Sequence, residues 1–187
     1  LPESIGNLSS LKYLELYSNQ LTSLPESIGN LSNLTFFSVL SNQLSGAIPE
    51  SIGGLISLEY FNVGLNSFSG EIPESIGEMT QLTELYLTQN QISGSLPSTI
   101  GNLTELTMVS IYNNQISGRI PETIGNLVNL VSLNAGVNQL DGEIPETIGN
   151  LTSLERLWIN SNNLYGVIPE SICNLDMLNW SADGFEG

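Results

Sequence analysis

The sequence predicts an α/β solenoid, an elongated domain in which one short unit is stacked many times. Two observations predict it. The prolines are periodic: Pro25, Pro49, Pro73, Pro97, Pro121, Pro145 and Pro169 are 24 residues apart, and Pro2 precedes Pro25 by 23. Seven asparagines keep the same register: Asn19, Asn42, Asn66, Asn90, Asn114, Asn138 and Asn162. A fixed period of this length is typical of repeat architectures, in which each unit buries its apolar face against its neighbours.

Each unit begins with a short apolar alternation, such as Leu14-x-Leu16, which predicts a strand with alternate side chains turned inward. The same pair recurs at Phe37/Val39, Phe61/Val63, Leu85/Leu87, Val109/Ile111, Leu133/Ala135 and Leu157/Ile159. Because every strand returns in the same direction after one unit, we expect a parallel sheet with one short strand per repeat.

The asparagine after each strand is expected inside the turn. A buried amide that lacks hydrogen bonds costs about 1–3 kcal/mol, and stacked asparagines avoid this cost by bonding backbone groups of their own and adjacent units. We therefore interpret the seven asparagines as a structural ladder.

The opposite side of each unit is predicted to hold a 3-10 or single-turn helix, because only a few residues separate the proline from the next strand. Pro49 fits the first turn of such a helix, where its missing N–H is not needed. Gly53 is placed to end the turn in a left-handed conformation. The glutamates after the prolines favour the N-terminal turn, with weak cation binding as the alternative: Glu3, Glu26, Glu50, Glu74, Glu122, Glu146 and Glu170.

One domain is expected over residues 1–187, with a fragmentary repeat at 1–10, about seven full repeats and a decaying repeat at 178–187. Since the chain opens in the middle of a repeat, we expect a piece of a longer protein. The net charge is −16, with 19 acidic residues against three basic ones and no histidine. Such a surface repels nucleic acid and anionic lipid. No apolar run reaches the roughly 18 residues that span a bilayer, so direct membrane insertion is not expected.

These columns resemble the plant-type leucine-rich repeat, LxxLxxLxLxxNxLxGxIPxxIGxL, over the chain up to about Leu178. The family includes plant receptor-kinase ectodomains, polygalacturonase-inhibiting proteins, and secreted or surface proteins of bacteria and algae. The resemblance implies a right-handed solenoid with a concave parallel sheet and short helical turns on the convex side. It also implies a second short strand at the LxGxIP segment, and ligand recognition without catalysis.

The chain departs from this pattern in two places. In the first full unit, the segment that corresponds to LxGxIP reads Leu21-Thr-Ser-Leu24-Pro25. It is one residue short and lacks the glycine, so a second short strand is not expected with certainty in this unit. The paired-cysteine caps of plant members are absent. The lone Cys173 stands where other units have glycine, and is either half of a capping disulfide whose partner lies elsewhere or a buried free thiol.

Recognition is expected on the concave face, toward which the residues flanking and between the two inward strand positions point. Eight of the 13 aromatic residues fall there. Tyr, Trp and Arg are enriched at binding hot spots, although cross-strand aromatic pairs also stabilise a sheet. The candidate ligand-binding residues are Tyr13, Tyr17, Phe36, Tyr60, Tyr86, Tyr112, Arg156, Trp158 and Trp180. Ser132, Asn134 and Gly136 form a gap between two aromatic clusters.

A hydroxyl column follows the glutamates: Ser4, Ser27, Ser51, Ser75, Thr99, Thr123, Thr147 and Ser171. Regular hydroxyl ladders can match an ice lattice, so ice binding through Ser/Thr or Asn ladders is an alternative function. The adjacent charged glutamates disfavour it, and local capping is the simpler interpretation.

Six Asn-x-Ser/Thr sequons are potential glycosylation sites in a secreted eukaryotic protein: Asn7, Asn30, Asn33, Asn102, Asn150 and Asn179. Four of them, Asn7, Asn30, Asn102 and Asn150, directly follow the Ile-Gly step and are expected on the outer surface.

The sequence does not support catalysis, because it lacks histidine, a nucleophile-base pair, a metal cluster and a phosphate loop. We expect no enzyme, no cofactor and no metal. The predicted function is non-catalytic recognition of a protein, peptide or glycan by a secreted or cell-surface protein, which is a monomer or part of a larger chain. Ice binding and a structural spacer are the alternatives.

Overall fold

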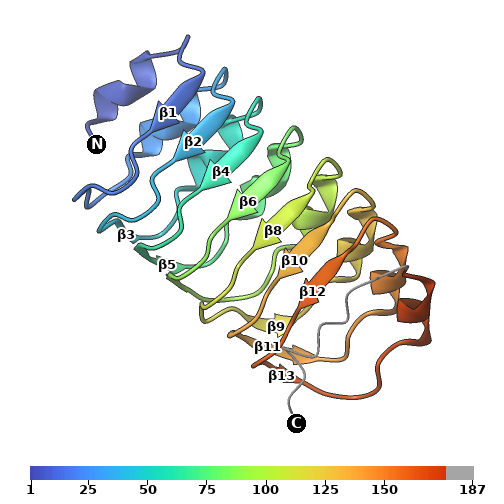
Figure 1. The fold of residues 1–187 in the computed structure, drawn as a ribbon. Coiled ribbons are helices and arrows are strands. Elements are labelled where there is room, and N and C mark those ends of the chain that lie inside the picture. The colour runs from blue at the N-terminus through green and yellow to red at the C-terminus, as the bar shows by residue number, and fades with distance from the viewer. Residues whose placement is uncertain (176–187) are drawn as a thin grey trace.

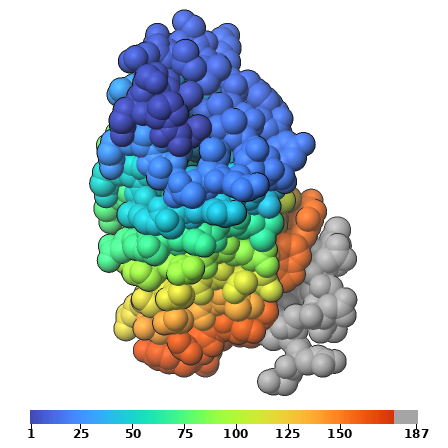
Figure 2. Space-filling model, turned by 90° about the vertical axis from the view of Figure 1, so that its left-hand side faces the viewer, coloured from blue at the N-terminus to red at the C-terminus, as the bar shows by residue number. Residues whose placement is uncertain are grey.

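The chain winds into a right-handed solenoid of stacked turns, as Figure 1 shows for the computed structural model, which describes residues 1–175. Each turn contributes one strand to a large sheet, and a 3-10 helix lies on the opposite side. Figure 2 shows the units as successive bands of colour, and each element contacts its counterparts in the adjacent units. The predicted α/β architecture is confirmed. That residues 1–187 form one domain stays a prediction.

The large sheet is parallel and has one strand per unit, in the order β1-β2-β4-β6-β8-β10-β12. The strands are β1 (Tyr13–Glu15), β2 (Phe36–Ser38), β4 (Tyr60–Asn62), β6 (Glu84–Tyr86), β8 (Met108–Ser110), β10 (Ser132–Asn134) and β12 (Arg156–Trp158). Residues at the same repeat position pair between adjacent strands: Tyr13 pairs with Phe36, and Phe36 pairs with Tyr60. The repeat period therefore sets the columns of the sheet.

The LxGxIP segments form two smaller parallel sheets. One contains β3 (Ser45–Gly46), β5 (Ser67–Gly70) and β7 (Gln91–Ile92), and the other β9 (Ser117–Arg119), β11 (Gln139–Gly142) and β13 (Asn163–Leu164). The glycine of each such segment has a φ between 71° and 88°, which favours glycine. The described first unit, which lacks this glycine, has no strand between Leu16 and Glu26.

The 3-10 helices begin directly after the prolines. They are η1 (Glu3–Asn7), η2 (Glu26–Asn30), η3 (Glu50–Gly54), η4 (Glu74–Glu78), η5 (Ser98–Asn102), η6 (Glu122–Asn126), η7 (Glu146–Asn150) and η8 (Glu170–Asn174). Their short length follows from the few residues available between the proline and the next strand.

The glycines inside these helices have a different role from the one predicted. None of them has a positive φ, so the expected left-handed ending at Gly53 is wrong. A Cβ at Gly101 would lie 2.5 Å from the Thr123 carbonyl oxygen and 2.6 Å from the Thr123 Cβ. Glycine is required at this position because adjacent helices approach each other closely.

The core is a continuous apolar column between the large sheet and the helices. Phe37, Phe61 and Phe68 are fully buried, and the rings of Phe37 and Phe61 lie 5.8 Å apart. Leu14 in the first unit and Leu157 in the last described unit are only half-buried. Burial is therefore most complete in the middle of the stack, where each unit has two described neighbours.

The asparagine column joins consecutive units through hydrogen bonds. Asn114 accepts a hydrogen bond from the Ile92 N–H at 3.0 Å and donates to the carbonyls of Leu87 and Ile111 at 3.0 and 3.1 Å. Equivalent bonds to the preceding unit are made by Asn42, Asn66, Asn90, Asn138 and Asn162. Asn19, in the first unit, is exposed and donates only within its own turn.

Candidate ligand-binding surface

The concave face of the large sheet carries a ladder of aromatic rings. The rings of Tyr13 and Phe36 stack at 4.1 Å and 8°, and those of Phe36 and Tyr60 stack at 4.3 Å and 4°. Parallel strands lie about 4.8 Å apart, so rings at the same repeat position meet face to face. We call Tyr13, Phe36, Tyr60 and Tyr86 the aromatic ladder.

Tyr86 joins the ladder diagonally, because it stands two residues after the register partner of Tyr60. Its ring centroid lies 5.5 Å from that of Tyr60, with the ring planes at 47°. The Tyr86 hydroxyl donates to the Glu84 carboxylate at 2.7 Å, while Asn62 Nδ2 donates to the Tyr60 hydroxyl at 2.9 Å. Burial, followed by the hydrogen bond to Glu84, raises the pKa of Tyr86 above its ordinary value. The ladder thus ends in an oriented carboxylate.

The other candidate tyrosines lie apart from the ladder. Tyr17 is exposed and Tyr112 is half-buried. They occupy one column but belong to units four strands apart, roughly 19 Å at the usual strand spacing. Between them the column holds Leu40 and Gly64 instead of aromatic residues. Leu40 covers Gly64, where a Cβ would come within 3.3 Å of the Leu40 Cδ1. The structure therefore does not bring these two tyrosines together.

A second group of candidates lies on β12. Arg156 and Trp158 are two residues apart on one strand and point to the same face, and Trp158 is 37 % exposed. Arg156 forms an ion pair with Glu155 at 3.8 Å, and both side chains are largely exposed. Such exposed pairs contribute little, so the guanidinium stays accessible. Trp180, the third predicted member, lies outside the described residues.

The gap predicted between the clusters lies on and after β10. Ser132 is 2 % exposed, Gly136 is buried, and Asn134 is half-buried. The side chain of Asn160 lies over Gly136, where a Cβ would be 2.8 Å from the Asn160 Oδ1. The concave face of this unit is therefore polar and has little relief.

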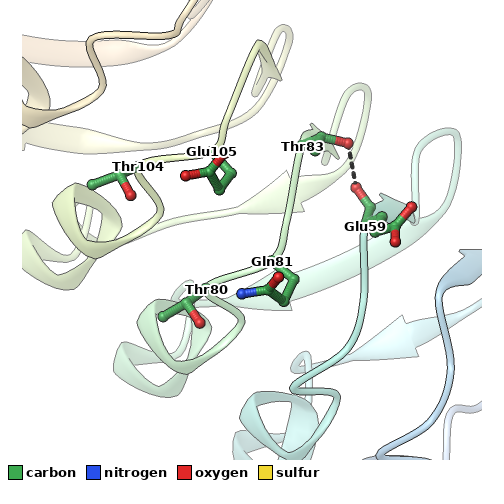
Figure 3. A pocket seen from close by; sticks show the side chains of 6 residues that line it. All are labelled: Glu59, Thr80, Gln81, Thr83, Thr104 and Glu105. Atoms are coloured by element: carbon green, nitrogen blue, oxygen red, sulfur yellow. Dashed lines mark hydrogen bonds between the residues drawn. The ribbon is translucent and has the colours of Figure 1, made fainter.

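A shallow hollow beside the sheet was not predicted from the sequence. It measures about 410 Å³ and is lined by Glu59, Thr80, Gln81, Thr83, Thr104 and Glu105. Figure 3 shows these side chains on the segments that lead into β4, β6 and β8, with the Thr83 hydroxyl bonded to the Glu59 carbonyl at 2.8 Å. Its residues belong to variable positions of the repeat, so no sequence signal distinguishes them. The hollow is open and mostly polar.

The hydroxyls of the Ser/Thr column form hydrogen bonds between adjacent units of the solenoid. The Thr123 hydroxyl donates to the Ser98 carbonyl of the preceding unit at 2.7 Å. The same inter-unit bond is made by Ser27, Ser51, Ser75, Thr99, Thr147 and Ser171. These bonds hold neighbouring 3-10 helices together. The expected local capping is therefore wrong, because the hydroxyls bond the preceding unit and the described helices have no side-chain cap.

Four sequon asparagines, Asn7, Asn30, Asn102 and Asn150, are exposed at the ends of η1, η2, η5 and η7. Asn33 is also exposed, but its side-chain amide donates to the Ser9 carbonyl at 2.8 Å. Asn179 lies outside the described residues.

Cys173 is exposed, so the interpretation of it as a buried thiol is wrong. It occupies the glycine position of its helix, where in earlier units a Cβ would meet the Ser or Thr of the next unit. Because η8 is the last described helix, no described Ser or Thr of a following unit lies against the Cys173 Cβ.

Many of the acidic side chains recur at one position of the repeat, directly after the proline, with one glutamate in most units. Among residues 1–175, no group of three or more His, Cys, Asp or Glu side chains is placed to hold a metal ion. Within the described range, no helix is long and apolar enough to cross a membrane.

The family follows from comparison with known proteins. A model described as "Leucine-rich repeat region" matches residues 2–93 and 85–180. The chain belongs to the leucine-rich repeat family. No curated protein sequence matches this leucine-rich repeat chain, but many solved structures resemble it.

Receptor ectodomains are among the similar structures. A TDR receptor is 37% identical with a TM-score of 0.90, over 93% of this chain and 30% of that chain. The ectodomain of the Arabidopsis receptor kinase HAESA, in complex with an IDA peptide hormone, is 32% identical with a TM-score of 0.90, over 95% of this chain and 30% of that chain. These neighbours confirm the plant-type repeat. The chain spans about a third of the length of these receptor chains.

A plant ice-binding protein is also similar, with a TM-score of 0.69, over 95% of this chain and 65% of that chain. Its identity of 23% shows a common fold alone.

Proposed function

We propose that this leucine-rich repeat chain is the non-catalytic recognition part of a secreted or cell-surface protein, and that it binds a peptide or protein segment on its concave face. The aromatic ladder carries this proposal. Its rings lie on the solvent side of the sheet, where the apolar core does not need them, and Tyr13 is 55% exposed. Rigid aromatic side chains provide large contact area at low entropy cost.

Two further observations support a bound polypeptide. The HAESA ectodomain, which shares the fold, is in complex with a peptide hormone, and a plant receptor 35% identical to this chain is in complex with RGF2. In addition, Arg156 and Trp158 provide a second anchor on the same face, separated from the aromatic ladder by the units of β8 and β10. An extended ligand can contact both anchors along the stack, with a glycan as the alternative ligand.

Ice binding has less support. The hydroxyls of Thr123 and its equivalents already donate hydrogen bonds to carbonyls of the preceding unit, so these hydrogens are not free to match a lattice. A structural spacer would need no exposed aromatic ladder. Recognition explains the composition of the concave face better than either alternative.

The test is a selection of random 12-residue peptides displayed on phage, followed by calorimetric titration of synthetic binders. Truncating an aromatic anchor typically costs 2 kcal/mol or more, and about 1.4 kcal/mol is tenfold. We therefore expect Phe36→Ala and Trp158→Ala each to weaken binding roughly thirtyfold at the site they touch.

Glu74→Gln and Glu146→Gln are the matched controls, because these residues are exposed on the helical side of the solenoid. They should change affinity less than about threefold, well under the effect of a hot spot. Thermal denaturation of each variant shows that it is folded. Loss of binding in the glutamate variants, with binding retained in Phe36→Ala and Trp158→Ala, would place recognition on the outer face and refute the proposal.

A further inference from the structure

Glu84 is a charged group built into the aromatic ladder. It is half-buried and stands on β6 in register between Tyr60 and Met108. The Tyr86 hydroxyl donates to its Oε2 at 2.7 Å. In the part of the chain that the structure describes, Glu84 has no ion pair, and its Oε1 has no hydrogen-bond partner. The carboxylate is thus held in one orientation, with one oxygen available.

Two tyrosine hydroxyls accompany Glu84 on the ladder, and each has a defined hydrogen-bond partner. The Tyr86 hydroxyl donates its hydrogen bond to Glu84, so its oxygen can accept a further bond. The Tyr60 hydroxyl already accepts from Asn62. The rings of Tyr60 and Tyr86 are tilted by 47°, rather than stacked as in the rest of the ladder. The rings of Tyr60 and Tyr86 therefore do not cover each other face to face beside the carboxylate, and both are only half-buried.

The charge on this half of the concave face is negative. The three concave columns carry Glu15, Glu84 and Arg156, and Arg156 lies three strands beyond Glu84 in the sheet order. The whole chain has a net charge of −16. Clefts and surfaces of one sign attract ligands of the opposite sign and raise their association rate. A cationic ligand is thus favoured both at long range and at the site.

We propose that Glu84 anchors an arginine of the bound polypeptide, with the guanidinium against the tilted rings of Tyr60 and Tyr86. The inference rests on the proposed function and specifies the ligand of the same surface. Guanidinium is planar, offers five donors, and both pairs with carboxylates and stacks on aromatic rings. An ammonium group is a compact point charge without a stacking face. A carboxylate with one available oxygen beside tilted aromatic rings therefore fits arginine better than lysine.

The Tyr86 hydroxyl has a positioning role in this arrangement, because it fixes Glu84, while the Tyr86 ring contacts the guanidinium. Tyr86→Phe keeps the ring and removes the hydrogen bond. We expect it to weaken arginine-dependent binding about threefold in the wild-type background, and to have no further effect when Glu84 is already Gln. This non-additivity distinguishes positioning from a direct contact.

The experiment uses the same phage selection at about 0.15 M NaCl, where the Debye length is about 8 Å and diffuse attraction is screened. Selected peptides should be enriched in arginine. Three versions of the best peptide are then synthesised, with arginine, lysine or citrulline at the enriched position. Citrulline is the neutral isostere of arginine, so it tests charge at constant shape.

We expect the citrulline peptide to bind at least tenfold more weakly than the arginine peptide, with the lysine peptide between them. In Glu84→Gln this arginine-to-citrulline ratio should fall below about twofold. Glu71→Gln is the matched control, since Glu71 is exposed beyond β5 and its substitution changes net charge equally; it should preserve the ratio.

The proposal is overturned if arginine is not enriched, or if the ratio is the same in wild type and Glu84→Gln. If peptides without arginine bind and lose affinity in Phe36→Ala, the arginine anchor is refuted while recognition by the concave face stands. If no selected peptide is sensitive to any concave variant, both proposals are wrong.

Discussion

At the scale of single residues, the buried asparagine joins the backbones of two units by hydrogen bonds. Asn114 is 9% exposed and forms three hydrogen bonds of 3.0 to 3.1 Å with backbone groups of two units. Asn114→Ala leaves the Ile92 N–H and two carbonyls short of partners. We expect a loss of about 1–3 kcal/mol, measured as a lower urea midpoint at unchanged m-value.

Asn19→Ala is the control for this prediction. Asn19 occupies the same repeat position but is exposed and bonds only Leu16 and Tyr17 in its own turn. Water can replace these bonds, so the loss should be less than half of that for Asn114→Ala. Equal losses would show that the cost comes from the turn alone and not from the inter-unit bonds.

The residue before each ladder asparagine is held in a left-handed conformation, with φ between 53° and 57°. Val137 has this conformation although it is β-branched, which makes it a costly position. The previous unit carries Asn113 there, and asparagine tolerates this region. We expect Val137→Asn to raise the free energy of unfolding by about 1 kcal/mol, the lower end of the cost of such a conformation.

The measurement is again urea unfolding. Val128→Asn serves as control, because Val128 is 45% exposed and its φ is negative; it should be neutral within about 0.5 kcal/mol. If both variants change stability equally, relief of backbone strain is not the cause.

The raised pKa of Tyr86 makes stability depend on pH in alkali. In the folded state Tyr86 keeps its proton to higher pH than the ordinary value of about 10, because of burial and the bond to Glu84. Above pH 10 the folded state then binds more protons than the unfolded state, so the free energy of unfolding falls as pH rises. The contribution is complete below pH 10 and is lost as pH rises through the folded pKa.

Urea unfolding between about pH 8 and 11, a range that brackets the ordinary tyrosine pKa, measures this dependence. We expect the alkaline loss to be smaller in Tyr86→Phe, which has no proton to lose, and in Glu84→Gln, which lacks the charged acceptor. Identical pH profiles for wild type and Tyr86→Phe would contradict the assignment.

At the scale of elements, stacking of the 3-10 helices depends on glycine. A Cβ at Gly101 would lie 2.5 Å from the Thr123 carbonyl oxygen, on a rigid backbone. Gly101→Ala must push η5 and η6 apart, and overpacking of this kind costs about 1–3 kcal/mol. At Gly46, where φ is 85° and a Cβ would have no atom within 4 Å, asparagine is expected to cost only a few tenths of a kcal/mol.

Thermal unfolding of Gly101→Ala and Gly46→Asn compares these two uses of glycine. The larger loss should fall on Gly101, although its backbone conformation is ordinary. A larger loss at Gly46 would mean that turn conformation, and not the spacing of helices, is the stricter requirement.

The elements themselves were predictable, because each is encoded inside one repeat. The alternation at Leu14 and Leu16 predicts a strand, and Pro49 predicts the start of a helix. The helix glycines were misinterpreted because their reason lies between units, in the approach of Thr123 to Gly101. A local pattern shows the conformation of a turn but not its distance from the next turn.

The concave surface was predictable in part for the same reason. The period places Tyr13, Phe36 and Tyr60 in one column, and the structure stacks their rings. The bond from Tyr86 to Glu84 depends on side-chain rotamers that the spacing does not determine. The hollow at Glu59 arises from three neighbouring segments at variable positions, so the sequence offered no signal for it.

At the scale of the whole molecule, the net charge opposes folding. Nineteen acidic residues face three basic ones, and the described residues form one ion pair, between Arg156 and Glu155. Folding brings the carboxylates of successive units close together in columns. Self-repulsion of this kind destabilises the compact state, and salt should relieve it.

We therefore expect the melting temperature to rise with ionic strength, from about 0.01 M, where the Debye length is roughly 30 Å, to about 0.3 M. A gain of about 1 kcal/mol corresponds to roughly 2–4 °C for a chain of this size. Calorimetry in NaCl and in MgCl₂ at equal ionic strength separates screening from specific binding. Screening predicts nearly equal shifts, whereas a larger shift in MgCl₂ would support the cation-binding interpretation of the glutamate column. A melting temperature that stays constant or falls with NaCl would show that repulsion among the carboxylates does not limit the stability of this solenoid.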